Sequence, residues 1–218
     1  MCKTCETKPV YEFTNQRKLC KNCFINWFQK KALYTIRKFA MIKRGDVISI
    51  KGSDYRAIAL KHLFEILEEK GVIEMRSLSS QSIAPNQASP RFSAKNLLVE
   101  NSQDKRFRDN YKGFQAKRGL NKIAITSTLD FEANEIVKTL IGGKEKDLKK
   151  QSPVEGKTIK PLYLFLDEEV LLYAKLKGLK FIQGKEGKDK ISEFIDEMEI
   201  KHPEVKRAVV NSYLKLYN

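Results

Sequence analysis

The sequence predicts an α/β protein, a parallel sheet with flanking helices, preceded by a small N-terminal cysteine module. Residues 45–75 give a β-branched strand, a polar turn, an amphipathic helix and a second strand, which together make the βαβ unit of a parallel sheet. Residues 121–143 repeat the strand, turn and helix. A chain of 218 residues, 41% of them hydrophobic, can bury one such core and carry a satellite module.

Local patterns define the elements of the first half of the body. Residues 45–50 form a strand, and the helix after it ends at Gly71. The apolar side chains expected to face inward from that helix are Ile58, Leu60, Leu63, Phe64 and Leu67. Residues 72–75 form the second strand. Residues 77–104, rich in Ser, Gln, Asn and Pro, are expected to be a loop, with a helix near 107–118.

The second half of the body begins with a strand over residues 121–126 and a helix over 131–143 that closes at a Gly-Gly pair. Glu132 and Glu135 on that helix are expected to be surface residues without a role. Residues 144–160 are rich in lysine and are interpreted as a linker. The C-terminal tail predicts two helices, the second started by Pro203.

All four cysteines lie in two CxxC pairs separated by fourteen residues, as Cys2, Cys5, Cys20 and Cys23. Each pair places two thiolates on a tight turn, and two facing turns form a closed tetrahedral site that suits a structural zinc ion. The residues between the pairs predict a short ribbon that turns at residues 14–16. An iron centre or two redox dithiols are the alternatives.

A basic amphipathic helix is expected directly after Cys23. Its aromatic residues Phe24, Trp27 and Phe28 recur at helical spacing and are assigned to packing. Residues 1–45 hold eleven Lys and Arg against two acids, so +9 of the formal charge of +15 lies there. This balance favours a nucleic-acid face over a merely solvated lysine-rich surface. The candidate contacts are Lys30, Lys31, Arg37, Lys38, Lys43 and Arg44.

The sequence lacks targeting and membrane signals. No run of eighteen apolar residues is present, so no membrane span is expected. The first two dozen residues are polar and carry cysteines, which does not fit a secretory signal. A cytoplasmic location is therefore expected, where thiols stay reduced and paired CxxC motifs indicate metal rather than disulfides.

Over nearly its whole length, and in order, the chain resembles the PP-loop (ATP-pyrophosphatase-type) tRNA 2-thiolation proteins of archaea and the eukaryotic cytosol, and three stretches carry this resemblance. The cysteine module resembles their N-terminal zinc module. The stretch IKPLYLFLDEEVLLYAKLKGL resembles their "KPL…E-E-V…YA…G-L" segment, and FIDEMEIKHPEVKRAVVNSYLKL resembles their terminal helix pair. The resemblance implies an adenine nucleotide alpha hydrolase-like fold, with tRNA as the substrate.

The chain departs from this family at both nucleotide motifs. Active members carry Ser-Gly-Gly-x-Asp-Ser after the first strand, where small residues at a helix N-terminus hold the ATP phosphates. Here the matching residues are Ile50, Lys51, Gly52, Ser53, Asp54 and Tyr55. The second motif, Gly-His-Asn-x-Asp-Asp, matches residues 126–131, which begin with Thr126 and keep one acid, Asp130. No cysteine lies in this part of the chain, whereas active members use cysteines there.

These departures predict a degenerate subunit rather than an enzyme. The nucleotide-binding positions would be Lys51, Gly52, Ser53, Asp54 and Thr126, with Asp54 and Asp130 as vestigial catalytic residues. ATP binding is not expected. The expected partners are tRNA and a catalytic PP-loop paralogue, or a second copy of this chain. The alternatives are a diverged but active ATP-dependent tRNA 2-thiolation enzyme, and an RNA-binding protein with no thiolation role.

The expected organisation has four parts. Residues 1–26 form the zinc module and residues 27–44 a basic connecting helix. Residues 45–183 form the degenerate PP-loop domain, and residues 184–218 a C-terminal helical segment.

Overall fold

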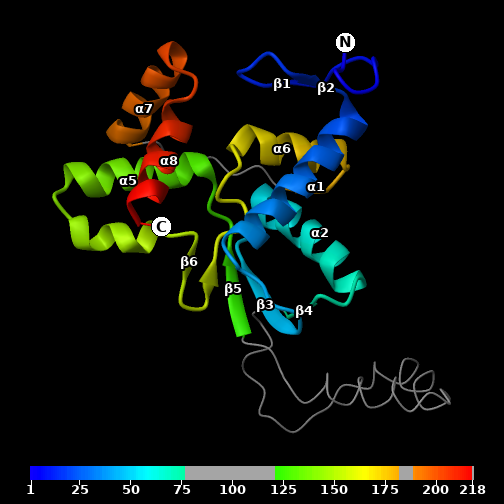
Figure 1. Ribbon diagram of the computed structural model, residues 1–218, viewed down its shortest axis with the longest axis horizontal. Coiled ribbons are helices and arrows are strands. Elements are labelled where there is room, and N and C mark those ends of the chain that lie inside the picture. Colours follow the sequence, from blue (N-terminus) through cyan, green and yellow to red (C-terminus); the bar gives the residue numbers. More distant parts are fainter. Residues whose placement is uncertain (77–120, 182–188, 218) are drawn as a thin grey trace, which may run out of the picture.

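The computed structural model describes residues 1–76, 121–181 and 189–217 (Figure 1). Its main sheet has the order β4-β3-β5-β7-β6. The strands are β3 (Asp46–Lys51), β4 (Ile73–Met75), β5 (Asn121–Ile125), β6 (Val154–Glu155) and β7 (Thr158–Ile159). All neighbouring pairs are parallel except β6 with β7 at the edge. The predicted α/β class is confirmed, while the expected loop 77–104 and helix 107–118 lie outside the described residues.

Two groups of helices accompany the sheet. The helices are α1 (Lys21–Lys38), α2 (Tyr55–Glu69), α5 (Leu129–Ile141), the 3-10 helix η3 (Glu145–Gln151), α6 (Asp167–Leu176), α7 (Lys190–Lys201) and α8 (Val205–Tyr217). In Figure 1, α1, α2 and α6 lie together on one side of the molecule, and α5, α7 and α8 lie together on the other. The predicted pair of C-terminal helices is confirmed, with α8 beginning two residues after Pro203.

The β3-α2-β4 unit forms where the local pattern predicts it. The Asp54 side chain accepts a hydrogen bond from the Ala57 N–H and so caps α2. Gly71, at φ +65, lets the chain turn from α2 into β4. Four of the five side chains expected to face inward are buried, and Ile58 is half-buried.

Two hydrophobic clusters correspond to the two helix groups. The first joins α1, α2 and α6 to the sheet through Ile48, Ala124 and Ile159. Within it the rings of Phe28 on α1 and Tyr173 on α6 stack with centroids 4.1 Å apart. The second cluster joins α5, η3 and α8. The α1 helix is thus part of the main core rather than a separate connector.

The N-terminal ribbon of β1 (Tyr11–Glu12) and β2 (Lys18–Leu19) is antiparallel, as expected. It packs onto the first two turns of α1, where Phe24 and Phe28 are fully buried and Trp27 lies against Phe13 and Phe24. The assignment of these aromatic residues to packing is therefore confirmed. Because α1 is continuous over Lys21–Lys38, the boundary expected after residue 26 falls inside a helix.

The interpretation of residues 144–160 as a linker is wrong. This segment forms η3 and the β6-β7 hairpin, and β7 pairs with β5 in the sheet. Strands of two residues are too short to show a period-two pattern, so only the lysine content of the segment was visible in the sequence, and it indicated a linker.

Among the described helices, none is long and apolar enough to cross a membrane.

Candidate functional site

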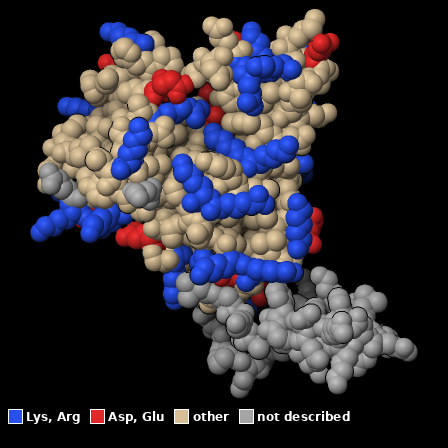
Figure 2. Space-filling model, viewed as in Figure 1, with Lys and Arg blue, Asp and Glu red and all other residues tan. Residues whose placement is uncertain are grey.

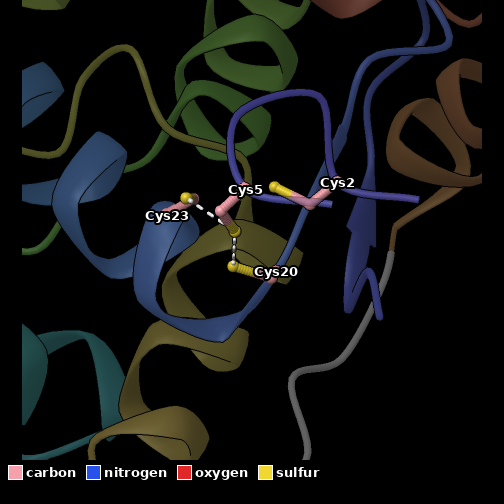
Figure 3. A group of neighbouring side chains, drawn as sticks. All are labelled: Cys2, Cys5, Cys20 and Cys23. Carbon is pink, nitrogen blue, oxygen red and sulfur yellow. Dashed lines mark hydrogen bonds between the residues drawn. The ribbon is translucent and has the colours of Figure 1, made fainter. Parts of the chain in front are cut away.

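The four cysteines converge at the N-terminal end of α1. Cys2 and Cys5 lie on the first loop, Cys20 directly precedes α1, and Cys23 lies in its first turn (Figure 3). The Sγ atom of Cys5 is 3.2 Å from that of Cys20 and 3.7 Å from that of Cys23. All four Sγ atoms lie within 4.8 Å of one another. The sequence-predicted ligand set is thus brought together in a geometry that could hold a metal ion.

The spacing of these thiols fits a single tetrahedral ion. Four thiolates at about 2.3 Å from one zinc ion stand about 3.8 Å apart, close to the separations between the Cys5 sulfur and its neighbours. The thiols also perturb one another. The pKa of Cys20 is lowered to about 6, chiefly by hydrogen bonds from the Thr7 side chain and the Cys23 backbone. The pKa of Cys23 is raised to about 12 by its neighbours Cys20 and Cys5. A metal ion bound between the thiols would displace the protons through which they now hydrogen-bond to one another.

The residues that match the family's nucleotide motifs meet at the carboxyl ends of β3 and β5. Lys51 and Ile125 are paired in register, so the turns after both strands start side by side. Gly52 has φ +136, and a Cβ built there would stand 3.3 Å from the Thr126 side chain. The structure therefore brings Gly52 and Thr126 together. Lys51, Gly52 and Ser53 are exposed at this edge.

An internal ion pair spans this edge. Arg56, in the first turn of α2, donates from Nε to Asp167 Oδ1 at 2.8 Å and from Nη2 to Asp167 Oδ2 at 2.9 Å. Thr128, at the N-terminus of α5, also donates its hydroxyl to Asp167 Oδ1 at 2.8 Å. One carboxylate at the start of α6 thus joins the N-termini of α2 and α5. Burial raises the pKa of Asp167 despite the opposing effect of Arg56.

The two vestigial catalytic candidates have structural partners here. Asp54 caps α2 and lies 3.3 Å from Arg56 Nη1. Asp130 accepts the backbone N–H of Asp167 at 2.7 Å and pairs with Lys206 of α8 at 2.8 Å. The two acids are connected through Asp167 rather than directly. Each is engaged by hydrogen-bond donors or cations of this chain.

The expectation that Glu132 is a surface residue is wrong. Its side chain is fully buried and pairs with Lys160, whose Nζ lies 2.8 Å from Oε1. The Ser127 hydroxyl also donates to this carboxylate. Burial raises the pKa of Glu132. Glu135 is half-buried and pairs with Lys138 one turn along α5.

The basic face follows α1 and the loop after it. Figure 2 shows Lys and Arg side chains over the face that α1 occupies in Figure 1, and further basic side chains below it. Lys30, Arg37, Lys38, Lys43 and Arg44 are exposed. These five sequence-predicted residues are therefore placed where a partner can reach them.

Lys31 differs from the other five basic residues. Its Nζ lies 2.8 Å from Glu169 Oε2, and its side chain is 16% exposed. The same ammonium stands over the rings of Trp27 and Phe165. Glu169 is fully buried and also accepts from Arg207, so Lys31 belongs to a pairing between α1, α6 and α8. Desolvation lowers the pKa of Lys31, which fits an interior position.

Sequence reasoning missed Arg56, Asp167, Glu169 and Lys160. The available signals were an Arg two residues after the helix cap and an acid directly before the Glu-Glu-Val stretch. Neither local pattern predicts that Arg56 and Asp167 pair with each other, because the two residues are 111 positions apart in the sequence.

Comparison with known proteins finds a curated relative and similar solved structures. No protein-family model matches the chain. A tRNA-5-methyluridine(54) 2-sulfurtransferase of Thermus thermophilus is 24% identical over 219 residues, covering 84% of this chain and 68% of that protein. The U34-tRNA thiolase NcsA of Methanococcus maripaludis, solved with its 4Fe-4S cluster, has a TM-score of 0.64 at 19% identity. That likeness covers 99% of this chain and 86% of the thiolase chain, so the two share a fold.

Proposed function

We propose that this protein is a non-catalytic, tRNA-binding subunit of a cytoplasmic tRNA wobble-uridine 2-thiolation complex. Both similar proteins are named as tRNA thiolation enzymes, which supports tRNA thiolation as the process. The chemistry would come from a catalytic PP-loop paralogue, or from a second copy of this chain if the alternative below holds.

The observation that supports a non-catalytic role best is the Arg56–Asp167 pair at the carboxyl ends of β3 and β5. An ATP phosphate held there needs cations and N–H groups at helix N-termini. In this chain those donors serve its own acids. The Ala57 N–H goes to Asp54, and the Asp167 N–H goes to Asp130.

The four-cysteine site would hold one structural zinc ion. Four cysteine sulfurs within 4.8 Å of one another enclose a volume for one ion, whereas a cluster of several irons would hold its ligands farther apart. The solved relative carries a 4Fe-4S cluster. This chain has four cysteines in all, so cysteine could hold such a cluster only at the same N-terminal site. Bound zinc would fix the ribbon against α1.

The exposed cations of α1 and the following loop would bind the tRNA backbone. Four thiolates and one Zn²⁺ take residues 1–45 from +9 to about +7, which is still strongly positive. Binding through such a face depends on phosphates rather than on bases and weakens as salt rises. Lys31 is left out of this face because its charge is already paired with Glu169.

The second candidate function is a diverged but active 2-thiolation enzyme, since both similar proteins are named as enzymes. This function would require Asp54 and Asp130 to bind Mg²⁺. Asp130 would then have to release Lys206 and the Asp167 N–H.

Genetic replacement in the native host separates the two functions. A strain that lacks this protein is complemented with the wild type or with the double variant Asp54→Asn, Asp130→Asn, and 2-thiouridine in its tRNA is measured by mass spectrometry. Asparagine keeps the helix cap at residue 54 but removes the charges needed for Mg²⁺. The proposal expects deletion to lower 2-thiouridine and both genes to restore it equally.

Loss of restoration in the folded double variant would make the chain an enzyme. Unchanged 2-thiouridine in the deletion strain would remove this protein from tRNA thiolation. Purification of the native protein with its bound proteins and RNA then identifies the partner.

A further inference from the structure

A groove of about 520 Å³ lies between the N-terminal ribbon and α1, beside the four-cysteine site. Its wall on α1 is formed by residues spaced at one helical face, Cys23, Asn26, Trp27, Lys30 and Tyr34. Because Cys23 is also a candidate metal ligand, an ion bound by the cysteines would fix the position of this wall against the ribbon.

Aromatic rings line the groove. Tyr34 is 56% exposed, and the Lys38 ammonium stands 5.9 Å from its ring centroid. Trp27 is half-buried and packs edge-on against Phe13 and at a tilt against Phe24, with centroids 4.7 and 5.4 Å away. A rigid indole and an exposed phenol on one helix face can contact a flat ring between or beside them.

Basic side chains and one amide side chain surround these rings. Arg17 lines the ribbon side with its guanidinium 4.8 Å from the Phe13 ring centroid. Its Nε is buried and has no hydrogen-bond partner among the described residues. Lys30 is exposed on α1, and Asn26 offers both an amide donor and an acceptor. The groove therefore combines flat apolar walls, a hydrogen-bonding amide and three cations, of which Lys31 is already paired with Glu169.

We propose that this groove binds an unstacked nucleobase of a single-stranded RNA segment. A nucleobase has a π-face that can stack on Tyr34 and contact the Trp27 ring beside the Lys31 ammonium, which stands over that ring. It also has edge atoms for Asn26 and Arg17, and a flanking phosphate for Lys30. The charge of +9 on residues 1–45 is complementary to the negative charge of an RNA strand. The inference rests on the proposed tRNA-binding function and adds a base contact to a face otherwise expected to read phosphates alone.

Trp27 provides a direct probe because it is the single tryptophan of the chain. The zinc-loaded full-length protein is titrated with a fluorescein-labelled single-stranded oligonucleotide and with a fully paired hairpin of equal length. Anisotropy reports RNA binding, and Trp27 emission, recorded with unlabelled RNA, reports contact with a base. We expect the single strand to quench Trp27 and the hairpin to bind without quenching.

Tyr34→Ala is expected to weaken single-strand binding by about 5- to 150-fold, the range for loss of one stacked base. Tyr34→Phe keeps the ring and should bind like the wild type. Tyr217→Ala is the matched control, since Tyr217 is 43% exposed on α8, outside the groove-lining set. An unchanged melting temperature shows that each variant is folded.

RNA binding that leaves Trp27 emission and the Tyr34→Ala affinity unchanged overturns the base pocket and leaves the basic face intact. Absence of RNA binding by anisotropy overturns the proposed tRNA-binding function as well. Quenching by an acidic tyrosine-bearing peptide but not by RNA also overturns the inference, because the groove would then take a protein segment.

Discussion

The guanidinium of Arg56 and the carboxylate of Asp167 form a two-point hydrogen-bonded pair, with N–O distances of 2.8 and 2.9 Å, across the N-termini of α2 and α6. Paired geometry of this kind is stronger and more specific than a single charge contact. The pair lies where the family resemblance implies a nucleotide. It therefore carries both a stability consequence and a functional one.

Loss of Arg56 should destabilise the fold. Arg56→Ala leaves Asp167 and Asp54 without their shared cation and is expected to lower the free energy of unfolding by about 2–3 kcal/mol. Arg76→Ala is the matched control, because Arg76 pairs with Glu74 on the surface and such pairs contribute about 0.5 kcal/mol. Urea unfolding measures both. Equal losses for the two variants would show that the Arg56 pair is an ordinary surface contact.

The buried Glu132–Lys160 pair should behave asymmetrically. Glu132→Ala leaves the Lys160 ammonium buried and uncompensated, which is expected to cost about 3–5 kcal/mol. The double variant Glu132→Leu, Lys160→Met removes both charges and should recover most of that loss. Thermal and urea unfolding compare them. A double variant as unstable as the single one would mean that the pair itself stabilises the fold.

Local and long-range features differed in how far the sequence could predict them. The β3-α2-β4 unit was predictable because Ile48, Leu60 and Phe64 follow periodic patterns within a few residues of one another. The pairing of Glu132 with Lys160 was not predictable, because a lysine in a lysine-rich segment is normally expected to be exposed to solvent. The two-residue strand β7 that positions Lys160 gives no pattern of its own.

The candidate site divides in the same way. The ligand set Cys2, Cys5, Cys20 and Cys23 was predictable from spacing alone, since metal-binding cysteines come in short pairs. The connections of Asp167 to Arg56 and Thr128 depend on which helix N-termini the fold brings together. Phe24, Trp27 and Phe28 on α1 were assigned to packing, and neither the groove beside Trp27 nor the exposed Tyr34 was predicted from the sequence.

Metal content should identify the ion at the cysteine site. Elemental analysis of the purified protein is expected to show about one zinc per chain and negligible iron. Cys20→Ser should lose the metal and make the ribbon sensitive to protease, while circular dichroism of the remaining helices persists. An iron–sulfur absorption band after anaerobic purification would contradict the zinc assignment.

Charge reversal should separate a defined RNA face from diffuse positive charge. Reversal of four exposed residues is expected to weaken tRNA binding strongly and to reduce its salt dependence: Lys30, Arg37, Lys38 and Lys43. The matched control reverses four exposed lysines of the η3 and hairpin region: Lys144, Lys146, Lys149 and Lys157. Filter binding at several salt concentrations measures both sets. Equal effects would favour a merely solvated basic surface.

Calorimetric titration of the purified protein with Mg-ATP tests the central claim, that the edge formed by β3 and β5 no longer takes a nucleotide. Arg56, Asp54, Asp130 and Asp167 satisfy one another there, and the account predicts no saturable heat at physiological ATP concentrations. The Asp54→Ala variant should give the same flat trace. Saturable binding by the wild type that Asp54→Ala abolishes would contradict the claim and return the chain to the ATP-dependent enzymes.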